Sequence, residues 1–437
     1  MNSAGNSRAT SIIAWALYDW GNSAFATTVM AAFFPIMLKQ YWDAGSDTAL
    51  STARLGFTNA LAGLLLALTA PLLGAIADLG SSRKRFLGIF AFTGAAATAS
   101  LAFIPSHRWD LALPLFAAGL IGYSAANIFY DALLTIVSPS DRVHTVSALG
   151  YSLGYLGGGL LFALNVWMTL DPLRFGLAST STAALVSFLI AGFWWAAFTL
   201  PLLMLTTEPR LTGVHSPASI RMGLRRLRDT FGEIRRLKPI WLFLLAYWFY
   251  IDGVDTIIKM AVDYGVAIGL DSSGLLKALI ITQFIGFPSA LVFGWAGERI
   301  GARNGIFIAL TGYLAVSIYA GFISTGFEFY LLAAVIGLIQ GGVQSLSRSM
   351  FSRMIPPEKC AEYFGFYNML GKFAAVAGPA IIGTTAFTLN RLGTAPGTAS
   401  RLSIVSVAIL FVLGGAILSR VPVSPESHGV PAAPIRS

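Results

Sequence analysis

The chain has 437 residues, of which 56% are hydrophobic and 11% are charged, with a mean hydropathy of +0.71. Soluble proteins carry about 25% charged residues, so this composition excludes a string of soluble domains and predicts a protein that crosses a membrane several times. The net charge of +9 comes mainly from basic residues in short segments between apolar runs, which favours orientation in a membrane over binding to nucleic acid.

Apolar runs long enough to cross about 30 Å of hydrocarbon occur twelve times along the chain. They cover residues 12–38, 53–77, 84–104, 111–137, 146–168 and 180–206, and then 240–267, 274–297, 304–325, 328–350, 361–388 and 402–420. The first run lacks the small-residue cleavage site of a signal peptide, so we expect it to be a spanning helix. The pattern predicts an all-α membrane protein with 12 transmembrane helices.

The runs fall into two groups of six, separated by the longest polar stretch of the chain. We expect an N-terminal six-helix bundle over residues 1–206, a cytoplasmic basic linker over 207–239, a C-terminal six-helix bundle over 240–420 and a disordered cytoplasmic tail over 421–437. The basic residues of the linker suit either an amphipathic surface helix on anionic lipid or a solvated connection.

Basic residues are distributed unevenly between the two sides of the predicted membrane. With the amino terminus inside, 20 Lys and Arg residues lie on the inner side, a count that includes Arg348, and 6 lie on the outer side. Three more, Lys259, Lys277 and Lys372, lie within or at the edge of spans. Because Lys and Arg concentrate in cytoplasmic loops, we expect both termini in the cytoplasm and the chain in a bacterial inner membrane.

The two halves repeat a loop motif that consists of a glycine, an acid four residues later and then basic residues. Its members are Gly74, Asp78 and Arg83 after the second span, and Gly294, Glu298 and Arg303 after the eighth. The two glycines are 220 residues apart, as are the two acids. Such a repeat predicts two pseudo-symmetric six-helix bundles related by an axis along the membrane normal.

This loop motif, in a chain of six plus six spans, resembles the signature of the major facilitator superfamily. The first copy departs from the signature, because Ser81 and Ser82 separate Gly80 from the basic residues. Within the superfamily, the chain resembles the autophagy-related vacuolar effluxer family and its bacterial relatives in residues 18–28, 127–134, 250–253, 340–349 and 364–367. The resemblance extends over about residues 12–420.

The resemblance implies a major facilitator fold in which spans 1, 4, 7 and 10 line a central cavity. The family is associated with export of amino acids from a storage compartment, so efflux of amino acids is one expected function. We also expect the acidic loop residues to act as a gate, by meeting basic residues or helix N-termini across the interface between the halves.

Four ionisable residues share one face of the apolar seventh span. Asp252, Asp255, Lys259 and Asp263 are spaced by three, four and four residues, which places them within an arc of about 80° on one helix. Charge inside a membrane is costly and usually marks an ion or substrate path. We expect Asp252 and Asp255 to bind a proton or a cationic group. Lys259 can alternatively serve only to pair with its neighbouring acids, and Asp263 is expected near the outer interface.

Spans 1 and 4 carry two further pairs of polar residues. Asp19 and Asn22 are three residues apart, and Asn127 and Asp131 are four apart, so each pair shares one helix face. Both pairs are predicted at a similar depth from the cytoplasmic side, facing one vestibule. Each acid can carry a proton through a transport cycle. Alternatively, Asp131 caps a helix or holds a basic residue as an inner gate.

Spans 10 and 11 offer Gln340, Gln344, Asn368 and Lys372 as candidate substrate-binding residues. Amides both donate and accept hydrogen bonds, which suits zwitterionic or polyhydroxylated solutes but equally suits contacts between helices. A lysine in the middle of a span needs a carboxylate partner, which Asp252, Asp255 or a substrate could supply.

The sequence predicts no metal site, no cofactor and no enzyme activity. The four histidines, His107, His144, His215 and His428, fall in predicted loops or tails, and no pair has metal-ligand spacing. The single cysteine, Cys360, allows no intramolecular disulfide and no cysteine-based metal site. No nucleophile–base set is present, and no P-loop follows the glycines of the fifth span.

These features predict a secondary transporter for a small polar organic solute that works by alternating access, coupled to protons as a symporter or antiporter. The expected partners are the small-molecule substrate, protons and the lipid bilayer, with the protein acting as a monomer. The alternatives are a membrane-embedded enzyme or lipid flippase, and a transport-inactive receptor.

Overall fold

The computed structural model describes residues 2–46, 48–79, 82–208, 229–267, 272–323, 325–374, 377–394 and 396–422. Within these ranges the chain forms helices and short turns, and no β-strand. The helices of the first half are α1 (Asn2–Ala24), α2 (Phe34–Met37), α3 (Thr48–Leu79), α4 (Arg83–Ser100), α5 (Trp109–Val137), α6 (Val143–Leu170) and α7 (Thr180–Leu205). Those of the second half are α9 (Lys238–Ala267), α10 (Ser272–Ile300), α11 (Ala302–Ala320), α12 (Gly326–Met354), α13 (Cys360–Ala374), α14 (Ala377–Arg391), α15 (Pro396–Val405) and α16 (Ala408–Leu418).

The helices agree with the predicted spans, with some differences at their ends. Ten stretches of the described helices are long and apolar enough to cross a membrane. The predicted spans 304–325 and 361–388 are outside these ten, and they correspond to α11 and to α13 with α14. The first span is longer than expected, because α1 continues through π-helical turns at Phe25–Phe33 and Leu38–Trp42. Such turns interrupt regular hydrogen bonding and leave no mark in the hydropathy pattern.

The predicted linker and tail are only partly described. Residues 209–228 and 423–437 lie outside the described ranges, whereas residues 229–236 are helical. α9 begins at Lys238, two residues before the predicted start of the seventh span, because a helix can extend beyond its apolar run.

Local signals explain where several helices start. Thr325 and Glu328 form a capping box at the start of α12: the threonine hydroxyl accepts from the Glu328 N–H, and the glutamate accepts from the Thr325 N–H. Ser179 accepts from the Thr182 N–H at the start of α7. These polar residues satisfy N–H groups that a helix leaves unpaired at its first turn.

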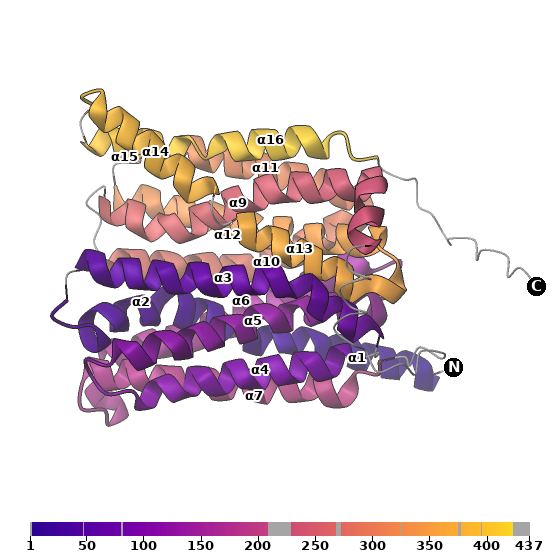
Figure 1. The fold of residues 1–437 in the computed structure, drawn as a ribbon, viewed down its shortest axis with the longest axis horizontal. Helices are drawn as coiled ribbons and strands as arrows, with labels where there is room; N and C mark the ends of the chain where they lie inside the picture. The colour runs from indigo at the N-terminus through magenta and orange to yellow at the C-terminus, as the bar shows by residue number, and fades with distance from the viewer. Residues whose placement is uncertain are drawn as a thin grey trace, which may run out of the picture.

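The helices form two groups that lie side by side (Figure 1). In the first half, α1 packs against α6 and α7, and α4 packs against α5 and α7. In the second half, α10 and α11 pack against α12, and α9 packs against α16. The halves meet through α6 with α10 and through α3 with α13. These pairs are the fifth span with the eighth and the second with the eleventh, which is the pairing expected of a twofold relationship between the halves.

Both copies of the repeated loop motif lie at one end of the bundle. The start of α1 and the end of α16 lie at this end, on the right of Figure 1. We call it the N-terminal side, and the opposite end the far side. α3 ends and α13 begins on the N-terminal side, so the motif after α3 lies beside the first turn of α13.

The exposed surface of the spanning helices is apolar. On α3, Phe57 is 71% exposed and Leu68 is 65% exposed, and Leu61, Leu64 and Leu65 are also exposed. Such side chains would be unfavourable in water but match the hydrocarbon of a bilayer. The outer face of α3 is therefore a lipid-facing surface.

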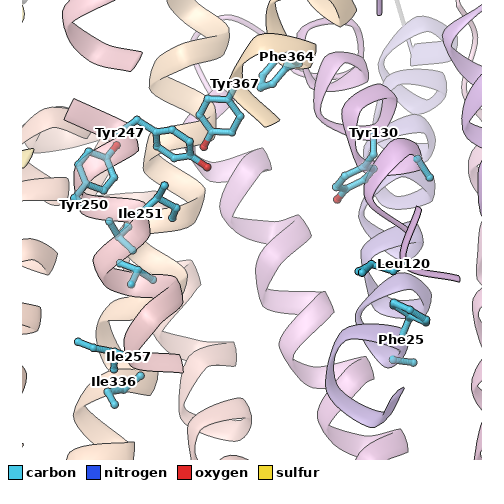
Figure 2. Packing of buried hydrophobic residues seen from close by; sticks show 14 of the residues in the cluster. Phe25, Leu120, Tyr130, Tyr247, Tyr250, Ile251, Ile257, Ile336, Phe364 and Tyr367 are labelled. Atoms are coloured by element: carbon cyan, nitrogen blue, oxygen red, sulfur yellow. The ribbon is translucent and has the colours of Figure 1, made fainter. Parts of the chain in front are cut away.

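The interior is filled by aromatic and small side chains. Figure 2 shows Tyr247 of α9 and Tyr367 of α13 close together, and their rings stack with centroids 4.0 Å apart. In the first half, the glycines of α6 bring it against α1, because a Cβ at Gly154 or Gly157 would strike Ser23 or Trp20. The glycines of the fifth span thus serve close helix packing.

Candidate substrate and proton site

A buried ion pair joins the two halves. Nη1 of Arg348 in α12 lies 3.2 Å from Oδ1 of Asp131 in α5, and the two residues are 2% and 7% exposed. Nε of Arg348 donates to the Ser147 hydroxyl at 3.0 Å, and Nη2 donates to the Ser147 carbonyl at 2.7 Å. The guanidinium thus binds α5 and α6 of the first half from α12 of the second.

Aromatic rings enclose this arginine. The guanidinium carbon lies 4.1 Å from the ring centroid of Tyr151, 5.0 Å from that of Trp15 and 5.3 Å from that of Tyr130. A cation over an aromatic face is attracted by the ring quadrupole, most strongly when water is excluded. The rings therefore lower the cost of keeping Arg348 buried and restrict where its guanidinium can go.

Asn368 connects the pair to α13. Its Nδ2 donates to Oδ2 of Asp131 at 3.2 Å and to the carbonyl of Phe364 at 2.9 Å. Asp131 thus uses one carboxylate oxygen for Arg348 and the other for Asn368. The structure brings these two predicted site residues together, although they are 237 residues apart in the chain.

Asp19 lies next to this network but is bound differently. The Ser23 hydroxyl donates to its Oδ1 at 3.2 Å, and the Tyr130 hydroxyl donates to its Oδ2 at 3.4 Å. In the described part of the chain, Asp19 forms no ion pair. Asp19 is 7% exposed, and Tyr130 contacts both Asp19 and the Arg348 guanidinium.

Asn22 and Asn127 bind each other. Nδ2 of Asn22 donates to Oδ1 of Asn127 at 2.9 Å, which joins α1 to α5. Oδ1 of Asn22 is buried and has no hydrogen-bond partner among the described residues. A buried amide oxygen without a partner is unfavourable, so this atom is available to a donor from a ligand.

The two glutamines lie close to the interface between α6 and α12. Tyr155 of α6 donates its hydroxyl to Oε1 of Gln344 at 2.9 Å. Gln340 lines a small hollow between α9, α10 and α12, where Thr282 is the other polar residue and the remaining lining is apolar. Gln344 therefore joins the two halves, and Gln340 lines a space within the second.

Asp252 of the seventh span binds the start of another helix, α14. Asp252 is 1% exposed and accepts from the Gly378 N–H with both carboxylate oxygens, each at 3.0 Å. Because Gly378 is the second residue of α14, Asp252 binds the start of that helix, where a negative charge is favoured. Asp255 lies one turn further along α9. The side chains of Lys259, Asp263 and Lys372 lie outside the described residues.

The acids of the repeated motif bind helix N-termini across the interface between the halves. Asp78 accepts from the N–H groups of Ala361 at 3.2 Å and Glu362 at 2.9 Å, in the first turn of α13, and from Nε of Arg83 at 2.7 Å. Arg83 in turn donates to the carbonyl of Pro357 at 3.1 Å. Asp78 thus binds a helix N-terminus of the other half and a basic residue of its own half.

The second copy repeats the arrangement. Glu298 accepts from the N–H groups of His144 at 2.8 Å and Thr145 at 3.1 Å, in the first turn of α6. Each acid thus binds a helix N-terminus of the other half, where the helix dipole favours negative charge. Arg303 differs from Arg83, because it donates to the carbonyl of Ser419 within its own half.

The motif glycines allow the backbones to approach at these points. A Cβ at Gly74 would overlap the carbonyl of Ala361, and a Cβ at Gly294 would overlap the side chain of Ala148. In each case the contact is with the other half. The N-terminal side is therefore closed by two equivalent contacts between the halves.

Two residues of this region differ from what the sequence indicates. Arg348 is counted with the inner-side basic residues and lies near the end of the predicted span 328–350, and the structure buries it within α12. The sequence predicts His144 in a loop, but His144 lies in the first turn of α6 and is 2% exposed. Both residues follow short stretches that contain polar residues. Arg348 lies four residues after Gln344 and so shares its helix face, which is the one feature of the sequence that indicates its position.

Comparison with known proteins agrees with this architecture. A family model described as "Vacuole effluxer Atg22 like" matches residues 50–427. The chain is 40% identical over 410 residues to the uncharacterized MFS-type transporter YxiO of Bacillus subtilis (strain 168), covering 93% of this chain and 94% of that protein.

Solved structures share the fold at low sequence identity. The proton:xylose symporter XylE bound to 6-bromo-6-deoxy-D-glucose matches with a TM-score of 0.72 and 13% identity, over 96% of each chain. The human organic anion transporter MFSD10 (TETRAN) matches with a TM-score of 0.65 and 17% identity, over 94% of this chain and 99% of that one.

The helical architecture and these matches define a multi-pass membrane protein of the major facilitator superfamily, whose members are transporters and not enzymes. Within that superfamily, the chain belongs to the vacuole effluxer Atg22 like family. The family and the all-helical membrane fold expected from the sequence are thereby confirmed, whereas ten of the twelve expected spans meet the length and hydropathy of a membrane span in the described residues.

Proposed function

We propose that this protein is a secondary active transporter that moves a small polar organic solute by alternating access and couples this movement to protons. Amino acids are the proposed substrate class and efflux is the proposed direction, in line with the effluxer description of the family. The two halves, residues 1–206 and 240–420, are the bodies that move relative to each other.

The observation that carries this proposal is the Asp131–Arg348 pair. A carrier that alternates needs contacts that close one side firmly and can be broken. This pair is buried and connects the halves, but Asp131 gives the guanidinium a single oxygen at 3.2 Å and not the bidentate contact that binds most strongly. The ion pair is therefore better suited to a contact that forms and breaks during transport than to a permanent contact between the halves.

Asp19 is the proposed proton site. Burial disfavours a charged carboxylate, and the contacts of Asp19 in the described residues are hydroxyl groups, which can also accompany a neutral acid. A change in the charge of Asp19 would change its electrostatic interaction with the neighbouring Arg348 guanidinium. Asp131 is the second candidate, and Asp252 and Asp255 remain candidates in α9.

The substrate site is proposed to lie between these groups and the glutamines. Asn22, Asn127, Gln340, Gln344 and Asn368 offer amide groups on both halves of the protein. Such groups bind solutes that combine donors and acceptors. Lys259 and Lys372 are proposed to balance the acids or to bind a substrate carboxylate.

We further propose that the protein lies in a bacterial inner membrane as a monomer, with both termini in the cytoplasm. The 20-to-6 distribution of basic residues supports this orientation. In that orientation, the N-terminal side is the cytoplasmic side, and the contacts that close it correspond to an outward-facing state.

Transport in proteoliposomes tests the proposal. Purified protein would first be screened by thermal shift against amino acids, peptides, sugars and nucleosides, and the stabilising compounds would then be assayed for accumulation with and without a pH gradient. Protein-free liposomes and the Arg348→Gln variant serve as controls. We expect the parent to accumulate the compound in a way that depends on the pH gradient, and we expect neither control to do so. If no compound in the panel crosses the membrane faster than in protein-free liposomes, the proposal is wrong.

A further inference from the structure

His144 occupies a buried position in the gate that the function above does not use. It lies in the first turn of α6, in the first half, yet its ring contacts two residues of α12 in the second half. Its Nδ1 is 2.7 Å from the Ser349 hydroxyl, and its Nε2 is 3.0 Å from Nη1 of Arg353. The imidazole is thus one of the contacts that close the N-terminal side.

These contacts define the protonation state of the ring. A guanidinium offers only hydrogen-bond donors, so Nε2 must accept from Arg353. The single ring proton is then on Nδ1 and is donated to Ser349, whose hydroxyl donates onward to the carbonyl of Leu346 at 3.1 Å. The closed arrangement therefore requires a neutral imidazole, because both nitrogens already have the partner that this tautomer needs.

A second proton would remove the contact with Arg353. It would place an N–H on Nε2 that points at Nη1, so that two donors and two positive charges would face each other. Arg353 also donates from Nη2 to the carbonyl of Ser140 at 2.8 Å, a second contact between the halves that does not involve the ring. Protonation of the ring would thus convert an attractive contact between the halves into a repulsive one.

The other charged groups near His144 do not offset this repulsion. Glu298 of α10 accepts from the backbone N–H groups of His144 and Thr145, and among the described residues the hydrogen-bond partners of the ring are Ser349 and Arg353. Asp141 and Arg142, in the turn before α6, are exposed and lie 3.7 Å from each other. Arg353 is therefore the described charge in direct contact with the imidazole.

We propose that His144 is a proton-binding site that opens the N-terminal side: a proton taken up from that compartment breaks the His144–Arg353 contact and separates α6 from α12. This inference rests on the proposed alternating access, but it concerns the gate and not the coupling proton. Histidine is suited to the role because its unperturbed pKa is about 6.5. Acidification of the compartment on the N-terminal side then favours opening toward that compartment.

Distances between spin labels across the gate test this proposal. In a Cys360→Ser background, cysteines would replace Arg85 in α4 and Asn304 in α11, two exposed positions on the N-terminal side of the two halves. Distance distributions would be measured for the full-length protein in lipid nanodiscs between pH 8 and pH 5. We expect the long-distance population of the parent to grow as the pH falls, by at most about tenfold per pH unit for one proton.

Two variants separate His144 from other titrating groups. His144→Gln can still accept from Arg353 but cannot be protonated, so we expect its distances to stay short at every pH. Arg353→Gln can still donate to Nε2 but lacks the charge, so its shift should be much smaller than that of the parent, even if His144→Gln does not fold. His107→Asn, at an exposed histidine on the far side, should behave like the parent.

The proposal is overturned if the parent shows no change with pH, or if both His144→Gln and Arg353→Gln keep the full shift. Failure of the proposed transport function would be seen differently. In that case the distances would still respond to pH through His144, but no solute would accumulate in liposomes. Conversely, a pH-independent gate with intact gradient-driven transport would reject the role of His144 alone.

Discussion

Asp131 and Arg348 occupy the same position in equivalent helices of the two halves, and they bind each other. α5 runs from Trp109 to Val137 and α12 from Gly326 to Met354, so each has 29 residues, and each of the paired residues lies 22 positions after the first. The repeat thus places an acid in one half opposite a base in the other. A twofold relationship brings such equivalent positions together near its axis, where they can form a gate.

Removing the charge of Asp131 should strongly destabilise the closed structure. Asp131→Asn leaves the Arg348 guanidinium buried without its counter-charge, and breaking a buried pair in this way costs about 3–5 kcal/mol. The double variant Asp131→Asn/Arg348→Gln removes both charges and should recover much of the loss. Thermal unfolding in one detergent measures both effects. Equal unfolding temperatures for the single variant and the parent would contradict the expectation.

Adding one methyl group at Gly74 should prevent closure of the N-terminal side. A Cβ there would overlap the carbonyl of Ala361 in α13, and backbone atoms at a helix start cannot easily move away. Gly74→Ala should therefore lengthen the distance between labels on α4 and α11 at neutral pH. Gly63→Ala is the matched control, because nothing lies within 4 Å of a Cβ at that position of the same helix. An equal response of the two variants would refute this role for Gly74.

The two copies of the motif should differ in strength although they are equivalent in position. Asp78 is fully buried and binds Arg83 as well as two N–H groups, whereas Glu298 is partly exposed and binds two N–H groups. Asp78→Asn leaves a buried arginine unpaired, so it should open the N-terminal side more than Glu298→Gln does. Label distances for both variants at pH 8 provide the comparison. A larger effect of Glu298→Gln would show that this ranking by burial is wrong.

The number and type of most helices could be predicted from the sequence, because apolar runs of spanning length leave little choice. The motif contacts could also be predicted, since Asp78 and Glu298 repeat at a fixed interval and helix N-termini are the partners that acids favour. The ends of the first span could not, because the π-helical turns around Phe34 depend on packing and not on hydropathy.

The membership of the central network was predicted only in part. Helix faces indicated that Asn22 and Asn127, and separately Asp131, would point inward. They could not show that Arg348 is the partner of Asp131, since an arginine near the end of a span fits a loop equally well. His144 was missed for the same reason. A basic residue at a helix end is informative only once the contacts between helices are known.

The last prediction separates the proposed proton site from an acid that stabilises a helix. Asn has the shape of Asp but stays neutral, so Asp19→Asn should abolish accumulation driven by a pH gradient while exchange of substrate between equal concentrations continues. Asp252→Asn tests the alternative candidate site in α9. The Asp252 carboxylate binds the start of α14, and loss of such a contact costs about 1 kcal/mol. We therefore expect Asp252→Asn to lower the unfolding temperature slightly and to retain gradient-driven accumulation. Both variants would be assayed in liposomes with and without a pH gradient, using a substrate that the parent transports. If Asp252→Asn alone loses accumulation, the coupling proton binds in α9 and not at Asp19.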